Sequence, residues 1–340
     1  SGESVSMSGN GSRVAIGAAG NIGSGSWNSG YGHVRIYDYN GSAWVQVGGD
    51  IDGEASGDGS GRSVSLSSDG SIVAIGATEN DAGNSSGDNR GHVRIYQYSS
   101  GSWTQVGSDI DGEAASDNFG HSVSLSSDGS IVAIGATGND AGNSNGDNRG
   151  HVRIYQYSSG SWSQLGSDID GEAASDNFGH SVSLSPNGSR VAIGGVLNDG
   201  NGSASGHVRV YEYSSGSWTQ LGADIDGEAA SDMSGQSVSL SSDGSIVAIG
   251  ARGNNGNGSL SGHVRIYQYS SGSWTQLGSD IDGEAASDYS GHSVSLSSNG
   301  SRVAIGAVNN DAGGGTNKGH VRIYQYSSGS WTQVGSDIDG

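Results

Sequence analysis

The stretch SLSSDGSIVAIGA, from Ser65 to Ala77, occurs again letter for letter from Ser124 to Ala136. Self-similarity at a fixed period indicates a protein built by stacking one supersecondary unit. Near-copies of the stretch begin at Ser6, Ser183, Ser239 and Ser295. Alignment on the Ser-Val pair gives six repeats, and we predict a single domain over 1–340 with repeats 1–62, 63–121, 122–180, 181–236, 237–292 and 293–340.

Each repeat contains four runs with the alternation of β-strands. In the second repeat these runs are Ser63–Ser67, Ser71–Ala77, His92–Tyr98 and Trp103–Ile110. None has the 3.6-residue period of an amphipathic helix. Four strands joined by short turns form an antiparallel meander of the size of one propeller blade.

Neighbouring repeats must cover the faces of such a sheet, because one meander cannot bury both alone. One face is small, with Ser63, Ser65 and Ala74, and the other is bulky, with Tyr96 and Tyr98. Small-against-large packing suits adjacent twisted sheets arranged around an axis. We therefore predict an all-β, six-bladed β-propeller with four antiparallel strands per blade; the alternative is an open solenoid or a fragment of a longer array.

Composition and charge exclude several classes of function. The chain has 340 residues, 64 of them Gly, and a formal net charge of −21. Such acidity disfavours nucleic acids and anionic membrane surfaces as partners, and it makes cations plausible ligands. There is no Cys, so disulfides are excluded, and no apolar run reaches the ~18 residues of a membrane span.

The connections distinguish the two ends of the predicted propeller. The first and third turns of each repeat are tight, as in SSDG and SSGS. The second connection is long and variable, running over 78–90 in the second repeat and 252–261 in the fifth, and the inter-blade connection over 111–120 is also long. Loops on a rigid scaffold are where binding residues concentrate. We expect the functional face at this long-loop end.

The phrase FGHSVSLSSDGSIVAIGA, from Phe119 to Ala136, and its copy from Phe178 resemble the FG-GAP repeats also found at the head of integrin α subunits. The proline of the family's GAP motif is replaced in every copy, and Phe-Gly becomes Ser-Gly in several. The family's calcium motif would fall in the first turn, which is too short here to carry it. The resemblance implies a secreted or cell-surface propeller that makes its contacts through the long-loop end.

Acidic residues alternate at the inter-blade connection. Carboxylates followed by a Gly turn are suited to calcium, which prefers several oxygen ligands. The alternative is that these acids flank a turn without binding an ion. The candidate ligands are Asp109, Asp111, Glu113, Asp168, Asp170 and Glu172.

The residue before each Ser-Val pair changes between repeats while the scaffold hardly does. We expect these side chains around the mouth of the central channel at the long-loop end, where they form either a ligand site or a solvated rim. They are Glu3, Arg62, His121, His180, Gln236 and His292, called here the collar residues.

Two further residue types recur once per repeat. The histidines of the GHV motif open the third strand, where their copies are too far apart to converge on one metal, so we expect packing or hydrogen bonding between blades. The tryptophans of the fourth strand are either plugs between blades or platforms for sugars. The tryptophans are Trp44, Trp103, Trp162, Trp218, Trp274 and Trp331.

No nucleophile motif or distinguished acid is visible, and we predict that the protein is not an enzyme. The leading hypothesis is a monomeric, non-catalytic extracellular or cell-surface scaffold that binds a protein or glycan through its long-loop end, with any signal segment outside this sequence. The alternatives are a multivalent lectin using the tryptophans, or an engineered or trimmed model propeller without activity of its own. No cofactor other than calcium is expected.

Overall fold

The computed structural model describes residues 2–21, 30–81, 87–140, 146–311 and 317–340. The chain forms two compact units, Ser1–Ala174 with Pro186–Gly188, and Ser175–Ser185 with Ser189–Gly340. Each unit contains three five-stranded sheets, and each sheet is one blade. The described residues contain strands and no helix, so no helix there is long and apolar enough to cross a membrane.

Unit 1 holds blades 1 to 3. Blade 1 consists of β1 (Ser4–Met7), β2 (Arg13–Ala18), β3 (His33–Tyr39), β4 (Trp44–Gln46) and β5 (Ile51–Asp52). Blade 2 consists of β6 (Ser63–Leu66), β7 (Ile72–Ala77), β8 (His92–Ser99), β9 (Ser102–Gln105) and β10 (Ile110–Asp111). Blade 3 consists of β11 (Phe119–Leu125), β12 (Ile131–Ala136), β13 (His151–Ser158), β14 (Ser161–Gln164) and β15 (Ile169–Asp170).

Unit 2 holds blades 4 to 6. Blade 4 consists of β16 (Phe178–Leu184), β17 (Arg190–Gly195), β18 (His207–Ser214), β19 (Ser217–Gln220) and β20 (Ile225–Asp226). Blade 5 consists of β21 (Ser234–Leu240), β22 (Ile246–Ala251), β23 (His263–Ser270), β24 (Ser273–Gln276) and β25 (Ile281–Asp282). Blade 6 consists of β26 (Ser290–Leu296), β27 (Arg302–Ala307), β28 (His320–Ser327), β29 (Ser330–Gln333) and β30 (Ile338–Asp339).

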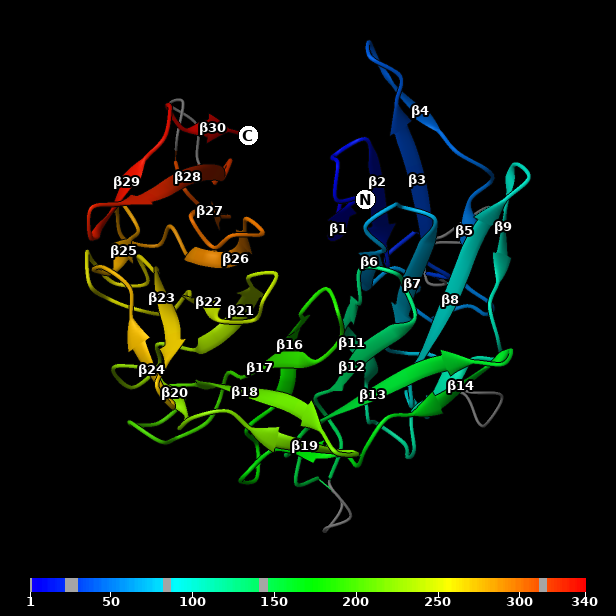
Figure 1. Ribbon diagram of the computed structural model, residues 1–340, viewed down its shortest axis with the longest axis horizontal. Helices are drawn as coiled ribbons and strands as arrows, with labels where there is room; N and C mark the ends of the chain where they lie inside the picture. Colours follow the sequence, from blue (N-terminus) through cyan, green and yellow to red (C-terminus); the bar gives the residue numbers. More distant parts are fainter. Residues whose placement is uncertain (1, 22–29, 82–86, 141–145, 312–316) are drawn as a thin grey trace. The chain divides into compact units, whose positions relative to one another are not determined.

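All six blades have the same antiparallel order, with the third strand paired to the second, the fourth and a short fifth strand. Figure 1 shows this for blade 2, where β8 runs between β7 and β9. The register places Val73 opposite Tyr96 and Gly76 opposite Val93. The prediction of an all-β, six-bladed propeller with four-stranded antiparallel meanders is confirmed. The assignment of all 340 residues to one domain stays a prediction.

The fourth run of each repeat differs from the prediction. We expected Trp103–Ile110 to form one strand, but it divides into β9 and the two-residue strand β10, both of which pair with β8. Between them Gly107 has a φ of +75°, a conformation that glycine adopts without steric cost. The apolar residues Trp103, Val106 and Ile110 do not alternate regularly, and the Gly-Ser-Asp cluster over 107–109 is a turn signal that the prediction overlooked.

The core of unit 1 lies between consecutive blades. Between blades 2 and 3, Val93 and Ile95 pack with Val132 and Ile134, all four almost fully buried. Burying one such side chain contributes about 1.5–3 kcal/mol relative to leaving it exposed. The same pairing of third-strand with second-strand residues forms the core between blades 1 and 2. Each blade is therefore stabilised by its neighbours, as the repeats predict.

The small face lets two blades approach closely at their first strands. The Ser63 hydroxyl donates a 2.7 Å hydrogen bond to the carbonyl of Gly120 in the next blade, and the N–H of Leu125 donates to Ser65 Oγ at 2.9 Å. A Cβ on Gly76 would collide with the Gly120 carbonyl oxygen. The small face thus contacts backbone of the next blade here, whereas the large aromatic residues fill the gap farther out.

Candidate functional site

Each collar residue follows a glycine in the left-handed region. Gly61, before Arg62, has a φ of +90°, and Gly120, before His121, has a φ of +89°. In blade 3 the pairing of β11 with β12 shifts register between Phe119 and Ser122. Such a bulge redirects a side chain relative to the regular strand. The same shift occurs in blades 4 to 6, whereas in blades 1 and 2 the first strand begins only at the Ser after residue X.

Three collar residues meet in one pocket of unit 1. Glu3, Arg62 and His121 line a cavity of about 650 Å³, within the usual size range of small-molecule sites. Arg62 Nη1 lies 2.6 Å from Glu3 Oε1, so this ion pair joins blades 1 and 2. The remaining lining residues come from second connections and inter-blade connections: Ala19, Gly20, Gly30, Gly57, Gly59, Thr78, Glu79, Asn118 and Thr137. These connections are those of the predicted long-loop end.

The lining of this pocket has a net negative charge. Burial, with a further contribution from the nearby Arg62 guanidinium, lowers the pKa of His121 to about 4, so its imidazole is neutral at pH 7. The pocket then contains one guanidinium, that of Arg62, which pairs with Glu3, and a second carboxylate, that of Glu79. The pocket offers a cation, two acceptor groups, an amide and hydroxyls around a glycine-rich wall.

The other three collar residues lie in unit 2. His180 and Gln236 occupy equivalent positions in β16 and β21. His292, in β26, lines a separate cavity of about 470 Å³ with Arg252 and Tyr289. Burial and the Arg252 charge lower the pKa of His292. The structure therefore brings together Glu3, Arg62 and His121, and it places His292 in a second pocket.

The metal candidates of the inter-blade connection are divided between clusters. Asp109 approaches His92 of its own blade, with 3.8 Å between Oδ2 and Nδ1, whereas Glu113 joins His151 and Asp168 of the next blade. Asp168 lies 3.0 Å from Arg153. These groups of His and carboxylate donors could hold a metal ion, but Asp109 and Glu113 do not share one loop sphere.

The remaining acids of this segment have mainly local partners. Asp111 and Asp170 pair across the ladder with His92 and His151, and burial and a neighbouring aspartate raise the pKa of each. The backbone carbonyl of Glu172 accepts a 2.8 Å hydrogen bond from an Arg149 guanidinium N–H.

Asp117, four residues after Glu113, builds the turn of this loop. Its carboxylate accepts hydrogen bonds from the N–H groups of Glu113 and Ala114 at 3.0 and 2.9 Å and from Asn139 at 3.2 Å. The side chain is thus used by the loop itself, and such local bonding of an aspartate to nearby N–H groups is a common turn device.

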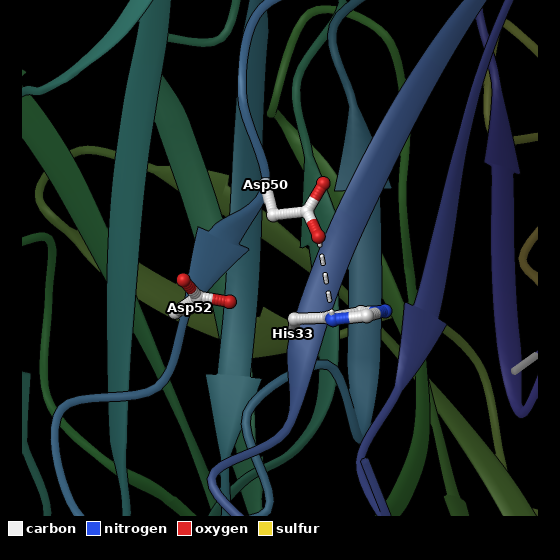
Figure 2. Close-up of side chains that lie close together, drawn as sticks. All are labelled: His33, Asp50 and Asp52. Atoms are coloured by element: carbon white, nitrogen blue, oxygen red, sulfur yellow. Dashed lines mark ion pairs between the residues drawn. The ribbon is translucent and has the colours of Figure 1, made fainter. Parts of the chain in front are cut away.

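Blade 1 carries the simplest of the His–carboxylate groups. His33, at the start of β3, faces Asp50 across 3.7 Å from Nδ1 to Oδ2, and Asp52 on β5 completes the group. Figure 2 shows these three side chains and the ion pair between His33 and Asp50. The GHV histidines are buried, as expected for a role in packing. The clusters around them were missed because the partners are far apart in the sequence.

The repeated tryptophans fill space between blades. Trp103 packs against Tyr98 with 5.1 Å between ring centroids, and its Nε1–H donates to the carbonyl of Val47 in blade 1 at 2.9 Å. Trp162, Trp274 and Trp331 make the equivalent hydrogen bonds to Val106, Leu221 and Leu277. These indoles have the geometry of plugs, one of the two roles open from the sequence.

Comparison with known families supports the repeat assignment. Residues 108–155 and 169–211 match the FG-GAP repeat family. The resemblance inferred from the sequence is confirmed over these segments. No curated protein matches the chain.

Solved structures with the same fold include two proteins with lactonase names. One, from Bacteroides uniformis, is provisionally assigned as a 6-phosphogluconolactonase and superimposes with a TM-score of 0.64 at 12% identity. The other, a periplasmic gluconolactonase from Pseudomonas aeruginosa, superimposes with a TM-score of 0.61 at 16% identity. In both cases the match covers 99% of this chain and 85% of the other chain.

The prediction that this protein is not an enzyme is wrong. It rested on missing nucleophile motifs and on the repetition of every acid, but the neighbours named as lactonases share this fold. Hydrolysis of a lactone can use a neutral base and a polarising cation and needs no nucleophile motif. Repetition in a propeller scaffold is therefore no argument against catalysis.

Proposed function

We propose that the protein binds a neutral, hydroxyl-rich ligand of the sugar class in the pocket of Glu3, Arg62 and His121. The observation that carries this is the charge and polarity of the lining: one guanidinium, two carboxylates, a neutral imidazole, an amide and two threonine hydroxyls. Alternating donors and acceptors suit sugar hydroxyls, which both donate and accept. The surplus of carboxylates, in a chain of net charge −21, disfavours phosphorylated or otherwise anionic ligands.

The pocket belongs to the long-loop end, so a ligand there could be a free sugar or the terminal residue of a glycan. An extracellular or periplasmic location agrees with the FG-GAP match and with a neighbour named as periplasmic. Calcium binding by the inter-blade loops stays a prediction. Because Asp109 and Glu113 lie in different clusters, calcium there would need backbone carbonyls to complete its six to eight oxygens.

A glycan array with the wild-type protein tests the binding proposal. We expect Arg62→Gln to lower the affinity for any bound sugar roughly tenfold or more, because a charge-assisted hydrogen bond is lost. The matched control is Arg35→Gln, since Arg35 has similar exposure and also makes one ion pair, with Asp50 at 2.9 Å. Absence of binding to every neutral glycan, or equal loss in both variants, would contradict the proposal.

Hydrolysis of a neutral sugar lactone is a second candidate, favoured by the neutral His121 near Arg62 and by the neighbours named as lactonases. His121 would accept a proton from water as its oxygen attacks the lactone carbonyl, and Arg62 would stabilise the developing oxyanion. The ring C–O bond then breaks as the ring oxygen takes the proton from the His121 imidazolium, giving a hydroxyl group and a carboxylic acid that ionises in water. Titration of the acid released from an aldonolactone substrate measures this reaction. Equal rates for the wild type and His121→Gln would exclude it.

A further inference from the structure

The GHV histidine of blade 2 faces two carboxylates that do not hydrogen-bond to it. The His92 side chain is 2% exposed, and its Nδ1 lies 3.8 Å from Asp109 Oδ2 and 3.9 Å from Glu54 Oε2. Within the described part of the chain, this Nδ1 has no hydrogen-bond partner. A buried polar atom without a hydrogen-bond partner lowers the free energy of unfolding. A ligand bound between the imidazole and the two carboxylates would satisfy this atom.

A similar grouping of one buried imidazole and two carboxylates recurs within unit 2, and among the described residues His320 Nδ1 in blade 6 likewise has no hydrogen-bond partner. In blade 5, His263 Nδ1 lies 3.9 Å from Glu228 and 3.8 Å from Asp280. In blade 6, His320 Nδ1 lies 3.9 Å from Glu284 and 3.5 Å from Asp337. Both histidine side chains are 1% exposed, whereas the carboxylates are 29–45% exposed. Each cluster therefore has a buried nitrogen at its base and two oxygen donors reachable from solvent.

The arginine two residues after each histidine adopts two arrangements. In blade 3, Arg153 bridges both carboxylates of its cluster, Glu113 and Asp168, and so occupies the place of a cation. In blade 2, Arg94 instead donates a 2.8 Å hydrogen bond to the carbonyl of Asp52 and stays 3.5 Å from Glu54. In blades 5 and 6, Arg265 and Arg322 donate in the same way to the carbonyls of Asp226 and Asp282, each in the preceding blade.

We propose that the clusters of blades 2, 5 and 6 bind a divalent metal ion of borderline softness, of which zinc is the representative. Imidazole nitrogen and carboxylate oxygen are both zinc ligands, and three such protein donors leave the fourth tetrahedral position to water. Ligands at about 2.1 Å from zinc in a tetrahedron lie about 3.4 Å apart. The carboxylate oxygens here lie 3.5–3.9 Å from the nitrogen, and in blades 2 and 5 the three donor atoms lie within 4.8 Å of one another, so rotation of the carboxylate side chains would complete the site.

The donor set also discriminates between metals. Calcium and magnesium prefer six or more oxygen ligands, whereas imidazole suits zinc, nickel and cobalt. The arginine beside each cluster lowers the net negative charge of that cluster. This weakens the binding of calcium or magnesium, which depends on carboxylate charge, more than the binding of zinc, which also bonds to the imidazole nitrogen. The proposal concerns the gaps between blades and is independent of the sugar pocket.

Competition with a chromophoric chelator, using the full chain with ZnCl₂, tests the proposal. We expect His92→Gln to remove one equivalent of bound zinc, and the combined substitution of His92, His263 and His320 to remove three. His151→Gln is the matched control. The Nδ1 of His151 also has no hydrogen-bond partner among the described residues, but Arg153 already bridges the two carboxylates of that cluster, so this substitution should leave the zinc count unchanged. CoCl₂ should give the visible absorption of a tetrahedral site, which disappears in the triple variant.

Since His92 is buried, Asp109→Asn provides a second test at a side chain that is 30% exposed. It should fold normally, as circular dichroism in EDTA will show, and weaken zinc binding at one site roughly tenfold or more. Zinc binding weaker than millimolar, an equal loss in His151→Gln, or displacement of zinc by equimolar calcium would overturn the proposal.

Discussion

The indole Nε1–H of Trp162 donates a 2.8 Å hydrogen bond to the carbonyl of Val106, which belongs to the preceding blade. The bond forms where the outer strand is interrupted between β9 and β10, and Gly107 leaves room for the ring. One blade thus provides a notch and the next provides the side chain that fills it. The same pair of features occurs at Gly48 with Trp103 and at Gly222 with Trp274.

Substitution of the notch glycine should destabilise the junction. A Cβ at Gly107 would lie 2.7 Å from Trp162 Cδ1, and the φ of +75° is unfavourable for alanine. Gly101 has a φ of +89°, but a Cβ there would have no neighbour within 4 Å, so Gly101→Ala measures the backbone cost alone. We expect Gly101→Ala to cost about 1–2 kcal/mol and Gly107→Ala about 1–3 kcal/mol more. Equal losses in urea unfolding would contradict the notch.

The hydrogen bond of the indole should also be measurable. Trp162→Phe leaves the Val106 carbonyl without its donor, and we expect a loss of about 1–3 kcal/mol in the free energy of unfolding. Trp44 in blade 1 is 45% exposed, so Trp44→Phe should change stability by less than about 0.5 kcal/mol. Similar effects at both positions would contradict a plug role specific to buried junctions.

Stability should fall on mild acidification, in part because of His121. Its folded-state pKa of about 4 lies below the ordinary 6.5, so between these values the unfolded chain binds more protons and the free energy of unfolding decreases as the pH falls. From pH 7.5 to pH 5 we expect His121 to account for about 1–2 kcal/mol of the decrease. Burial also lowers the pKa values of His92, His151 and His263 to about 4, so these histidines add to the decrease over the same pH range.

Comparison of the wild type with His121→Gln isolates this contribution. The two should differ in the change of unfolding free energy between pH 7.5 and pH 5, with the smaller decrease in the variant. Parallel pH profiles for the two proteins would show that His121 titrates normally in the folded state.

The strands could be predicted because their signals are local. In Ser71–Ala77, Val73 and Ile75 alternate with Ala74 and Gly76, and the structure forms β7 over Ile72–Ala77. The break of the outer strand has a local signal in the Gly-Ser-Asp cluster over 107–109, which the prediction passed over. The residue that docks at the break could not be predicted, because Trp162 lies more than fifty residues away and comes from another blade.

The candidate sites likewise combine features that have a local sequence signal with features that depend on contacts between distant residues. The collar could be located from the Gly-X-Ser-Val pattern, since a left-handed glycine precedes residue X in every blade. That Glu79 and Asn118 join Arg62 in one pocket depends on loops of successive blades, and no spacing in the sequence encodes this. Likewise Glu54, His92 and Asp109 come together from two blades, so the acids of the connection did not reveal their histidine partner.

The most direct test of the central claim is isothermal titration of the best sugar from the array into wild-type protein, Arg62→Gln and Trp103→Phe. Binding in the pocket predicts that Arg62→Gln loses roughly tenfold or more in affinity, about 1.4 kcal/mol, while Trp103→Phe binds as the wild type does. Retained binding in Arg62→Gln together with lost binding in a folded Trp103→Phe would contradict the pocket and place the sugar on the tryptophans.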